Sequence, residues 1–132
     1  MTYRVIIAGG RDFDDYYLLE DNLMEWLMEL YVFYHDKPDY VDLEFISGKA
    51  KGADTLGEKF ASKNNCKIKE FPADWNTYGK AAGPIRNEEM AKYASEADKG
   101  VLFAFWDGKS RGTKSMIDLA SRYGLEVHVI NY

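Results

Sequence analysis

Cysteine and histidine are scarce in this sequence. It contains one cysteine, Cys66, and two histidines, His35 and His128. A single cysteine cannot close an internal disulfide, and these three residues do not form the Cys/His cluster that a zinc site needs. We therefore expect a fold without disulfides, without a bound metal and without any other resident cofactor.

Long apolar runs, low-complexity stretches and blocks of like charge are also lacking. The apolar run at residues 5–8 is too short for a signal peptide core or a membrane span. The 132 residues suffice for one domain and are too few for two, and 46% hydrophobic with 30% charged residues is ordinary for a globular protein. We expect a single cytoplasmic domain, residues 1–132, that does not bind a membrane.

An excess of positive charge is missing too, because the formal net charge is −5. An acidic chain of this size lacks the wide basic face that grips a long polyanion, so nucleic acid is not an expected partner. The positive charges that are present are unevenly distributed, and their distribution carries more information than the total.

Short β-branched apolar runs alternate along the chain with segments of helical periodicity. Strands are expected at residues 3–8, 41–46, 67–71, 100–106 and 126–130. Helices are expected from residue 15 to about 34, over 53–64, from Pro84 to about 95, and from the glycine loop at 108–112 to about 123, with a polar turn at 36–39 and a loop at 72–83. Such alternation predicts an α/β fold with a mainly parallel five-stranded sheet between two layers of helices.

The first helix carries more apolar surface than one sheet contact needs. One face presents Leu19, Leu23, Leu27, Leu30 and Tyr34 at steps of three or four. Further apolar residues lie elsewhere on the same helix, namely Met24, Trp26, Met28, Tyr31, Val32 and Phe33. A second buried face is therefore expected, and with it a homo-oligomer, most simply a dimer.

Four loops would meet at the carboxyl edge of a parallel sheet, at residues 9–13, 47–54, 74–87 and 106–114. They hold eight of the 11 glycines and eight of the 17 Lys and Arg residues, but four of the 22 Asp and Glu residues. Glycine lets a phosphate approach the backbone N–H groups of a helix N-terminus. Any one of these loops alone is better explained by a turn glycine, but their gathering at one edge favours a small phosphate-bearing ligand that resembles a nucleotide.

Familiar nucleotide-binding motifs are absent. There is no G-x-G-x-x-G, and Gly108–Ser115 only half resembles a P-loop, because three rather than four residues separate its glycines and Thr113 precedes Lys114. We therefore do not expect an ATPase or an NAD-dependent dehydrogenase.

Several side chains of these loops suit a nucleotide. Arg11 and Arg86 either fork onto phosphate or are solvated surface arginines. Trp75, like Tyr78, either stacks on a base or packs in the core. The candidate ligand-binding residues are Gly9, Gly10, Arg11, Ser47, Gly48, Lys51, Gly52, Asp54, Asp74, Trp75, Arg86, Asn87, Gly108, Gly112 and Thr113.

The residues of these loops also resemble a known family. The resemblance is carried by Gly9–Phe13, Ser47-Gly48 with Gly52–Asp54, Pro72–Trp75, Gly79–Asn87 and Gly112-Thr113. Together they resemble the YspA-like branch of the SLOG superfamily, which also includes the DprA/Smf proteins and the LOG phosphoribohydrolases. The resemblance implies a Rossmann-like three-layer sandwich with strand order 3-2-1-4-5, a nucleotide-derived ligand near the ends of the first and fourth strands, and frequent dimers.

The resemblance leaves enzymatic activity open. LOG enzymes, which cleave the N-glycosidic bond of nucleoside monophosphates, carry a catalytic glutamate three residues after a Gly-Thr pair, where this chain has Met116. Such cleavage needs a carboxylate to stabilise an oxocarbenium-like state or to position water. The candidate catalytic residues are Asp54, Asp74 and Glu88, although Asp54 is equally suited to cap its helix.

Two hypotheses about function remain. The first is a nucleotide-binding domain that senses or processes its ligand. The alternative is an N-glycosidase of the phosphoribohydrolase type, acting on a nucleoside monophosphate or a nucleotide sugar. Single-stranded DNA binding, by analogy with the DprA relatives, is disfavoured by the acidic balance of the chain.

Overall fold

The computed structural model describes residues 1–35 and 41–132, so the polar turn expected at residues 36–39 lies outside the described residues. Strands and helices alternate along the described chain. The elements are β1 (Thr2–Gly9), α1 (Tyr16–Phe33), β2 (Asp42–Ser47), α2 (Ala53–Lys63), β3 (Lys67–Glu70), α3 (Trp75–Tyr78), the 3₁₀ turn η2 (Gly79–Ala81), α4 (Ala82–Ser95), β4 (Lys99–Trp106), α5 (Arg111–Arg122) and β5 (Glu126–Asn131).

The five strands form one sheet in the order β3-β2-β1-β4-β5, and every neighbouring pair is parallel. In the centre of the sheet, Val5 of β1 pairs with Phe45 of β2 and with Val101 of β4. The chain winds from β1 outward to β3 and then returns to the other side of β1, so the direction of winding changes between β1 and β4. The predicted α/β fold and its strand order are confirmed.

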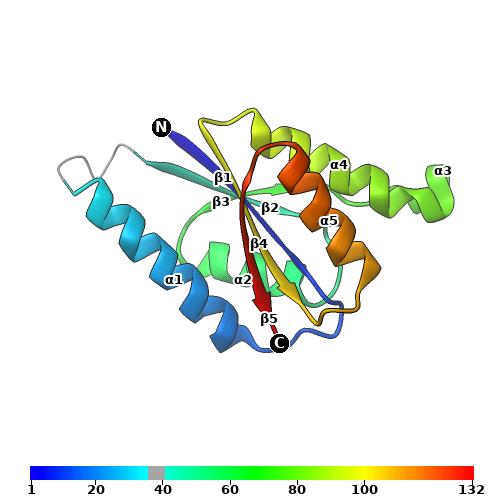
Figure 1. The fold of residues 1–132 in the computed structure, drawn as a ribbon, viewed down its shortest axis with the longest axis horizontal. Coiled ribbons are helices and arrows are strands. Elements are labelled where there is room, and N and C mark those ends of the chain that lie inside the picture. The colour runs from blue at the N-terminus through cyan, green and yellow to red at the C-terminus, as the bar shows by residue number, and fades with distance from the viewer. Residues whose placement is uncertain (36–40) are drawn as a thin grey trace.

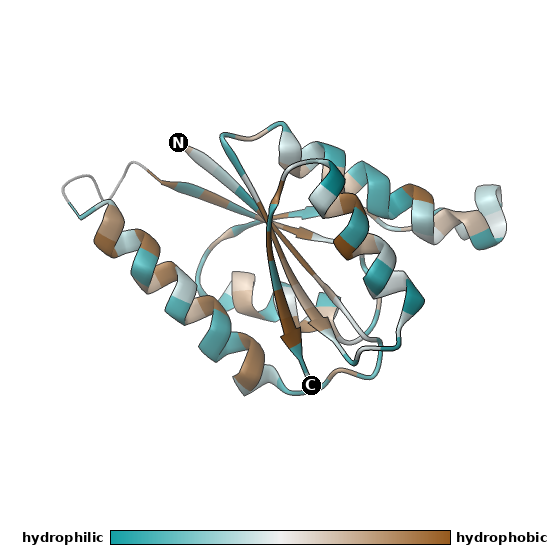
Figure 2. Cartoon of the chain, in the orientation of Figure 1, coloured by the Kyte–Doolittle hydropathy of each residue, from teal (hydrophilic) through white to brown (hydrophobic). Residues whose placement is uncertain are grey.

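Helices cover both faces of this sheet (Figure 1). Successive residues of β1 point to opposite faces, so Val5 and Ile7 join one buried cluster while Ile6 and Ala8 join the other. The first cluster lies under α1 and α2, and the second lies under α4 and α5. In Figure 2, apolar residues are concentrated in the inner strands, and the helices on both sides are of mixed polarity.

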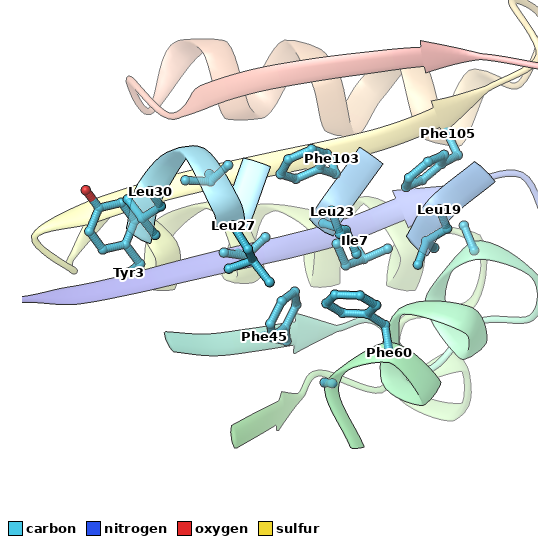
Figure 3. Close-up of a cluster of buried hydrophobic side chains, with 14 of the residues drawn as sticks. Tyr3, Ile7, Leu19, Leu23, Leu27, Leu30, Phe45, Phe60, Phe103 and Phe105 are labelled. Atoms are coloured by element: carbon cyan, nitrogen blue, oxygen red, sulfur yellow. The ribbon is translucent and has the colours of Figure 1, made fainter. Parts of the chain in front are cut away.

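Helix α1 packs as its periodicity predicts. The Asp15 carboxylate caps it by accepting a hydrogen bond of 3.1 Å from the Leu18 amide. The four leucines Leu19, Leu23, Leu27 and Leu30 are buried, and their side chains lie close to Phe45, Phe60, Phe103 and Phe105 (Figure 3). Burying one such leucine stabilises the fold by about 1.5–3 kcal/mol, so this seam fixes α1 on the sheet.

The segment between β3 and α4 differs from the expected loop. Asp74 accepts a hydrogen bond of 3.2 Å from the Thr77 amide and so caps the short helix α3, which continues through η2 into α4. The glycines at positions 79 and 83 favour a loop here, but the Asp74 cap stabilises a short helix instead.

In the described parts of the chain, no helix is both long enough and apolar enough to cross a membrane.

Candidate functional site

A cleft of about 740 Å³ lies outside the carboxyl ends of β1 and β4. This is the point where the winding of the sheet changes direction, the usual ligand position in open parallel sheets. Its walls come from the end of β1, the start of α4 and the loop that leads from β4 into α5. The volume falls within the range of about 300–1,000 Å³ that small-molecule sites occupy.

Two of the predicted glycines hold the loops together at the base of the cleft. The Gly10 carbonyl accepts hydrogen bonds of 3.3 Å from the amides of Phe13 and Ala53. Gly52 has φ +76°, and a β-carbon there would overlap the Gly10 carbonyl oxygen. Gly52 is therefore explained by its role in the turn. Gly9 and Gly10, in contrast, line the cleft itself.

Asp54 is the buried carboxylate of the site, with 6% of its surface exposed. It follows the N-terminus of α2 and does not cap that helix, because Gly52 occupies the cap position without a side-chain bond. Its Oδ2 instead accepts the Ala50 amide at 3.3 Å, and the Gly48 amide also interacts with it. The carboxylate therefore accepts the hydrogen bonds that these loop amides would otherwise donate to a phosphate.

Burial raises the pKa of Asp54 to about 6. The Ala50 amide and the positive charge of Arg86 oppose this shift, because both favour the ionised carboxylate, but desolvation outweighs them. A carboxyl group with this pKa exchanges a proton near neutral pH, as a general acid or base must.

Arg86 is half-buried and bound on two sides, so it is not a solvated surface arginine. Its Nη1 donates to the Gly48 carbonyl, and its Nε donates to Asn87 Oδ1 at 2.9 Å. Burial lowers the pKa of Arg86, and the neighbouring Asp54 carboxylate opposes that shift. Buried Asn87 therefore orients the guanidinium at the wall of the cleft.

The N-terminus of α5 opens into the same cleft. Ser110 caps it, because its Oγ accepts the Thr113 amide at 3.4 Å. The Asp107 carboxylate accepts the Lys109 and Ser110 amides, each at 2.8 Å, and fixes the loop before the helix. A β-carbon at Gly112 would meet nothing within 4 Å, so the space beside the first turn of α5 is open.

Two predicted aromatic residues are exposed rather than buried, so packing in the core is the wrong interpretation for both. Trp75 and Tyr78 each have 50% of their surface exposed. Trp75 lines the cleft and lies against the start of α4, where a β-carbon at Gly83 would be 3.5 Å from its ring. Tyr78 does not line the cleft.

Of the three predicted catalytic carboxylates, the structure places Asp54 in the cleft and the other two outside it. Asp74 is exposed and caps α3. Glu88 is exposed on α4 and accepts a hydrogen bond of 3.1 Å from the Tyr123 hydroxyl. Met116 lines the cleft, so a thioether lies where LOG enzymes carry their glutamate.

Within residues 1–35 and 41–132, no three His, Cys, Asp or Glu residues are grouped closely enough to hold a metal ion.

The other predicted ligand-binding residues divide between the cleft and its surroundings. Buried Thr113 lines the cleft. Ser47 is buried behind it, where its hydroxyl donates to Glu58 Oε2 at 2.6 Å. Gly108 is exposed in the loop before α5 and does not line the cleft. Gly48 and Lys51 line an adjoining hollow.

Sequence reasoning missed several residues of the cleft. Arg111 lines it, and its position between a capping Ser110 and Gly112 was the available signal. Asp12 lines it as well, and its Oδ1 accepts a hydrogen bond of 2.7 Å from the Tyr132 hydroxyl. Burial and that bond raise the pKa of Tyr132 to about 12. No local pattern signals a contact between residues 120 positions apart.

Comparisons with known proteins found one matching family model and a curated relative. The family model described as the YspA, cpYpsA-related SLOG family matches residues 3–78, from β1 through α3. A curated protein, the Gene 61 protein of Mycobacterium phage D29, is 31% identical over 129 residues, which are 94% of this chain and 93% of that protein. No solved structure matches the chain at a significant level.

Proposed function

Because this chain belongs to the YspA, cpYpsA-related SLOG family, as its resemblance predicted, we propose that it binds a nucleotide or nucleotide-derived ligand through a phosphate in the cleft outside β1 and β4. The domain would act as a sensor of this ligand or take part in processing it. Family membership supports a nucleotide-related function, and the geometry of the cleft supports the position of the phosphate.

The observation that carries this proposal is the N-terminus of α5 at the wall of the cleft. The first turn of a helix leaves backbone N–H groups without intrahelical acceptors and carries a partial positive charge. Ser110 takes one of these amides, while the space beside Gly112 is open and Arg111 lines the same wall. A helix N-terminus of this kind binds phosphate.

The alternative phosphate position, the backbone amides of the loop between β2 and α2, is already filled from within the chain. The Asp54 carboxylate accepts the Ala50 amide there and lies next to Gly48. A phosphate bound by these backbone amides would have to displace the Asp54 carboxylate, to which the Ala50 amide is already bonded. The two helix N-termini therefore have different roles, and α5 is the one that binds the anion.

The proposal is tested by titrating the purified chain with nucleoside phosphates of the four common bases, at low salt and in the presence of EDTA, by calorimetry. Arg111→Ala is expected to weaken binding by about tenfold, the value of one charge-assisted hydrogen bond to phosphate. Arg122→Ala is the matched control, because Arg122 is exposed at the opposite end of the same helix. Absence of binding by any nucleotide at millimolar concentration would reject the proposal.

Cleavage of an N-glycosidic bond is the second candidate function, and Asp54 favours it. Asp54 is the predicted catalytic carboxylate that lines the cleft, and its pKa of about 6 suits proton transfer near neutrality. Release of free base from a nucleoside monophosphate is expected to vanish in Asp54→Asn and to persist in Glu88→Gln, since Glu88 lies outside the cleft. If no substrate of the panel releases its base, cleavage is rejected, and nucleotide binding is decided by the calorimetric titration alone.

A further inference from the structure

A second hollow of about 700 Å³ adjoins the cleft, and we name it the lateral cleft. It is lined by Arg11, Gly48, Lys49, Ala50, Lys51, Pro72, Ala73, Trp75 and Arg86. Arg11, Ala50, Trp75 and Arg86 line both spaces. One ligand can therefore extend from the N-terminus of α5 past Trp75 into the lateral cleft.

Among the residues that the structure describes, four cationic side chains and no carboxylate line the lateral cleft. Lys49 is neutralised, because its Nζ lies 2.9 Å from Glu58 Oε1 and 3.7 Å from Glu70 Oε1. Arg11 and Lys51 are exposed, and no ion pair joins either of them to another of the described residues. Two positive charges are thus left for a ligand.

Arg11 and Arg86 also repel one another across the boundary of the two spaces. Arg11 is close enough to contribute to the lowering of the Arg86 pKa, after the larger effect of burial. The Asp54 carboxylate offsets the charge of Arg86, whereas Arg11 and Lys51 keep exposed positive charges at the lateral cleft, and these charges attract an anion. The main cleft differs, because three carboxylates, Asp12, Asp54 and Asp107, line it.

The volumes of the two spaces also favour a ligand larger than a nucleoside monophosphate. The main cleft alone falls within the range of volumes that small-molecule sites occupy, so a nucleoside monophosphate does not require the lateral cleft. Half-exposed Trp75 lines both spaces, so a ligand that extends from one into the other passes this side chain. A ligand that uses both spaces extends past Trp75, and exposed Arg11 and Lys51 favour negative charge on the part that enters the lateral cleft.

We infer that the lateral cleft is a second anion subsite, so that the preferred ligand is a nucleotide with an oligophosphate chain rather than a nucleoside monophosphate. One phosphate binds the N-terminus of α5, and a further phosphate of the same chain binds between Arg11 and Lys51. This inference rests on the proposed function and adds the class of ligand to it.

Calorimetric titration of the full chain with nucleoside mono-, di- and triphosphates of one base, in buffer containing EDTA, tests this subsite. The triphosphate is expected to bind at least about tenfold more tightly than the monophosphate, as one additional charge-assisted contact provides. Lys51→Ala is expected to bring this ratio of affinities close to one. Arg111→Ala is expected to weaken both ligands alike and keep the ratio, and Lys92→Ala, an exposed position on α4, is the control that changes neither.

The outcomes separate the two proposals. If mono- and triphosphate bind equally, or if Lys51→Ala leaves their ratio as it is in the unchanged chain, the second subsite is rejected while nucleotide binding at α5 stands. If no nucleotide binds at all, the proposed function fails and this inference fails with it.

Discussion

Asp54 and Arg86 face each other across Gly48, from α2 and α4 on opposite faces of the sheet. A β-carbon at Gly48 would lie 2.8 Å from Arg86 Nη1 and 2.9 Å from Asp54 Oδ2. Arg86 holds the Gly48 carbonyl, while Asp54 accepts the amide of Ala50 two residues later. The loop after β2 is thus clamped from both sides, and its glycine is required by the narrow space between the two charged groups.

Gly48→Ala is expected to lower the free energy of unfolding by about 1–3 kcal/mol, the usual cost of inserting a methyl group into packed space. The added methyl must push Arg86 or Asp54 away from the loop. Urea denaturation monitored by tryptophan fluorescence measures this loss. A variant as stable as the unchanged chain would show that the clamp is loose.

Asp54 is expected to make stability depend on pH. Its folded pKa, about 6, lies above the ordinary value of 3.8, so folding favours the protonated form. The stabilisation is complete below about pH 4 and is lost as the pH rises through 6, with a total change of up to about 3 kcal/mol. The difference in unfolding free energy between the unchanged chain and Asp54→Asn should therefore decrease from pH 4 to pH 7. A constant difference would contradict a raised pKa.

Gly112→Ala is expected to separate stability from binding. Gly112 lies in the first turn of α5, and a β-carbon there meets nothing within 4 Å. Alanine favours a helix over glycine by up to about 1 kcal/mol, so the variant should be at least as stable as the unchanged chain. Its methyl group would nevertheless stand where a phosphate approaches the α5 amides, so nucleotide affinity should fall. If the variant keeps its nucleotide affinity, the phosphate does not bind at this turn.

Helix α1 keeps an apolar stripe that the fold does not cover. Tyr17, Met24, Met28 and Tyr31 are exposed, by 76%, 38%, 63% and 50%, and their spacing puts them on one side of the helix. Figure 2 shows apolar positions recurring along its length. Light scattering at micromolar concentration is expected to give twice the 15.2 kDa mass of one chain. Met28→Glu should give the mass of one chain, with Glu29→Gln as the neighbouring control. A monomer before any substitution would contradict this expectation.

The fold was predictable because local signals agree with the global arrangement. The leucine repeat of α1, the β-branched runs of β1 and β4, and the stop of α5 before Gly124 at φ +73° each predict the element that forms. Helix α3 was missed because it is a short segment, capped by Asp74 and followed directly by Gly79. A four-residue helix has too few residues to show a period.

The site was predictable in outline, because the carboxyl ends of parallel strands share one edge of the sheet. Sequence could not show that Asp54 would bind the amides of its own loop, or that Asp74 and Glu88 would face away from the cleft. These outcomes depend on side-chain direction, which spacing alone does not fix. The contact of Tyr132 with Asp12 likewise follows from the position of β5 beside β4, not from any pattern near either residue.

The most direct measurement of the central claim is a ¹H–¹⁵N correlation spectrum of the chain during titration with the tightest-binding nucleotide. If the phosphate binds at the N-terminus of α5, the amide signals of Gly112 and Thr113 should shift first and most, together with Gly10 at the end of β1. The amides of Gly100 and Gly124, at the opposite end of β4 and α5, should stay in place. Shifts confined to residues outside the cleft, or no shifts at saturating nucleotide, would contradict the proposed binding site.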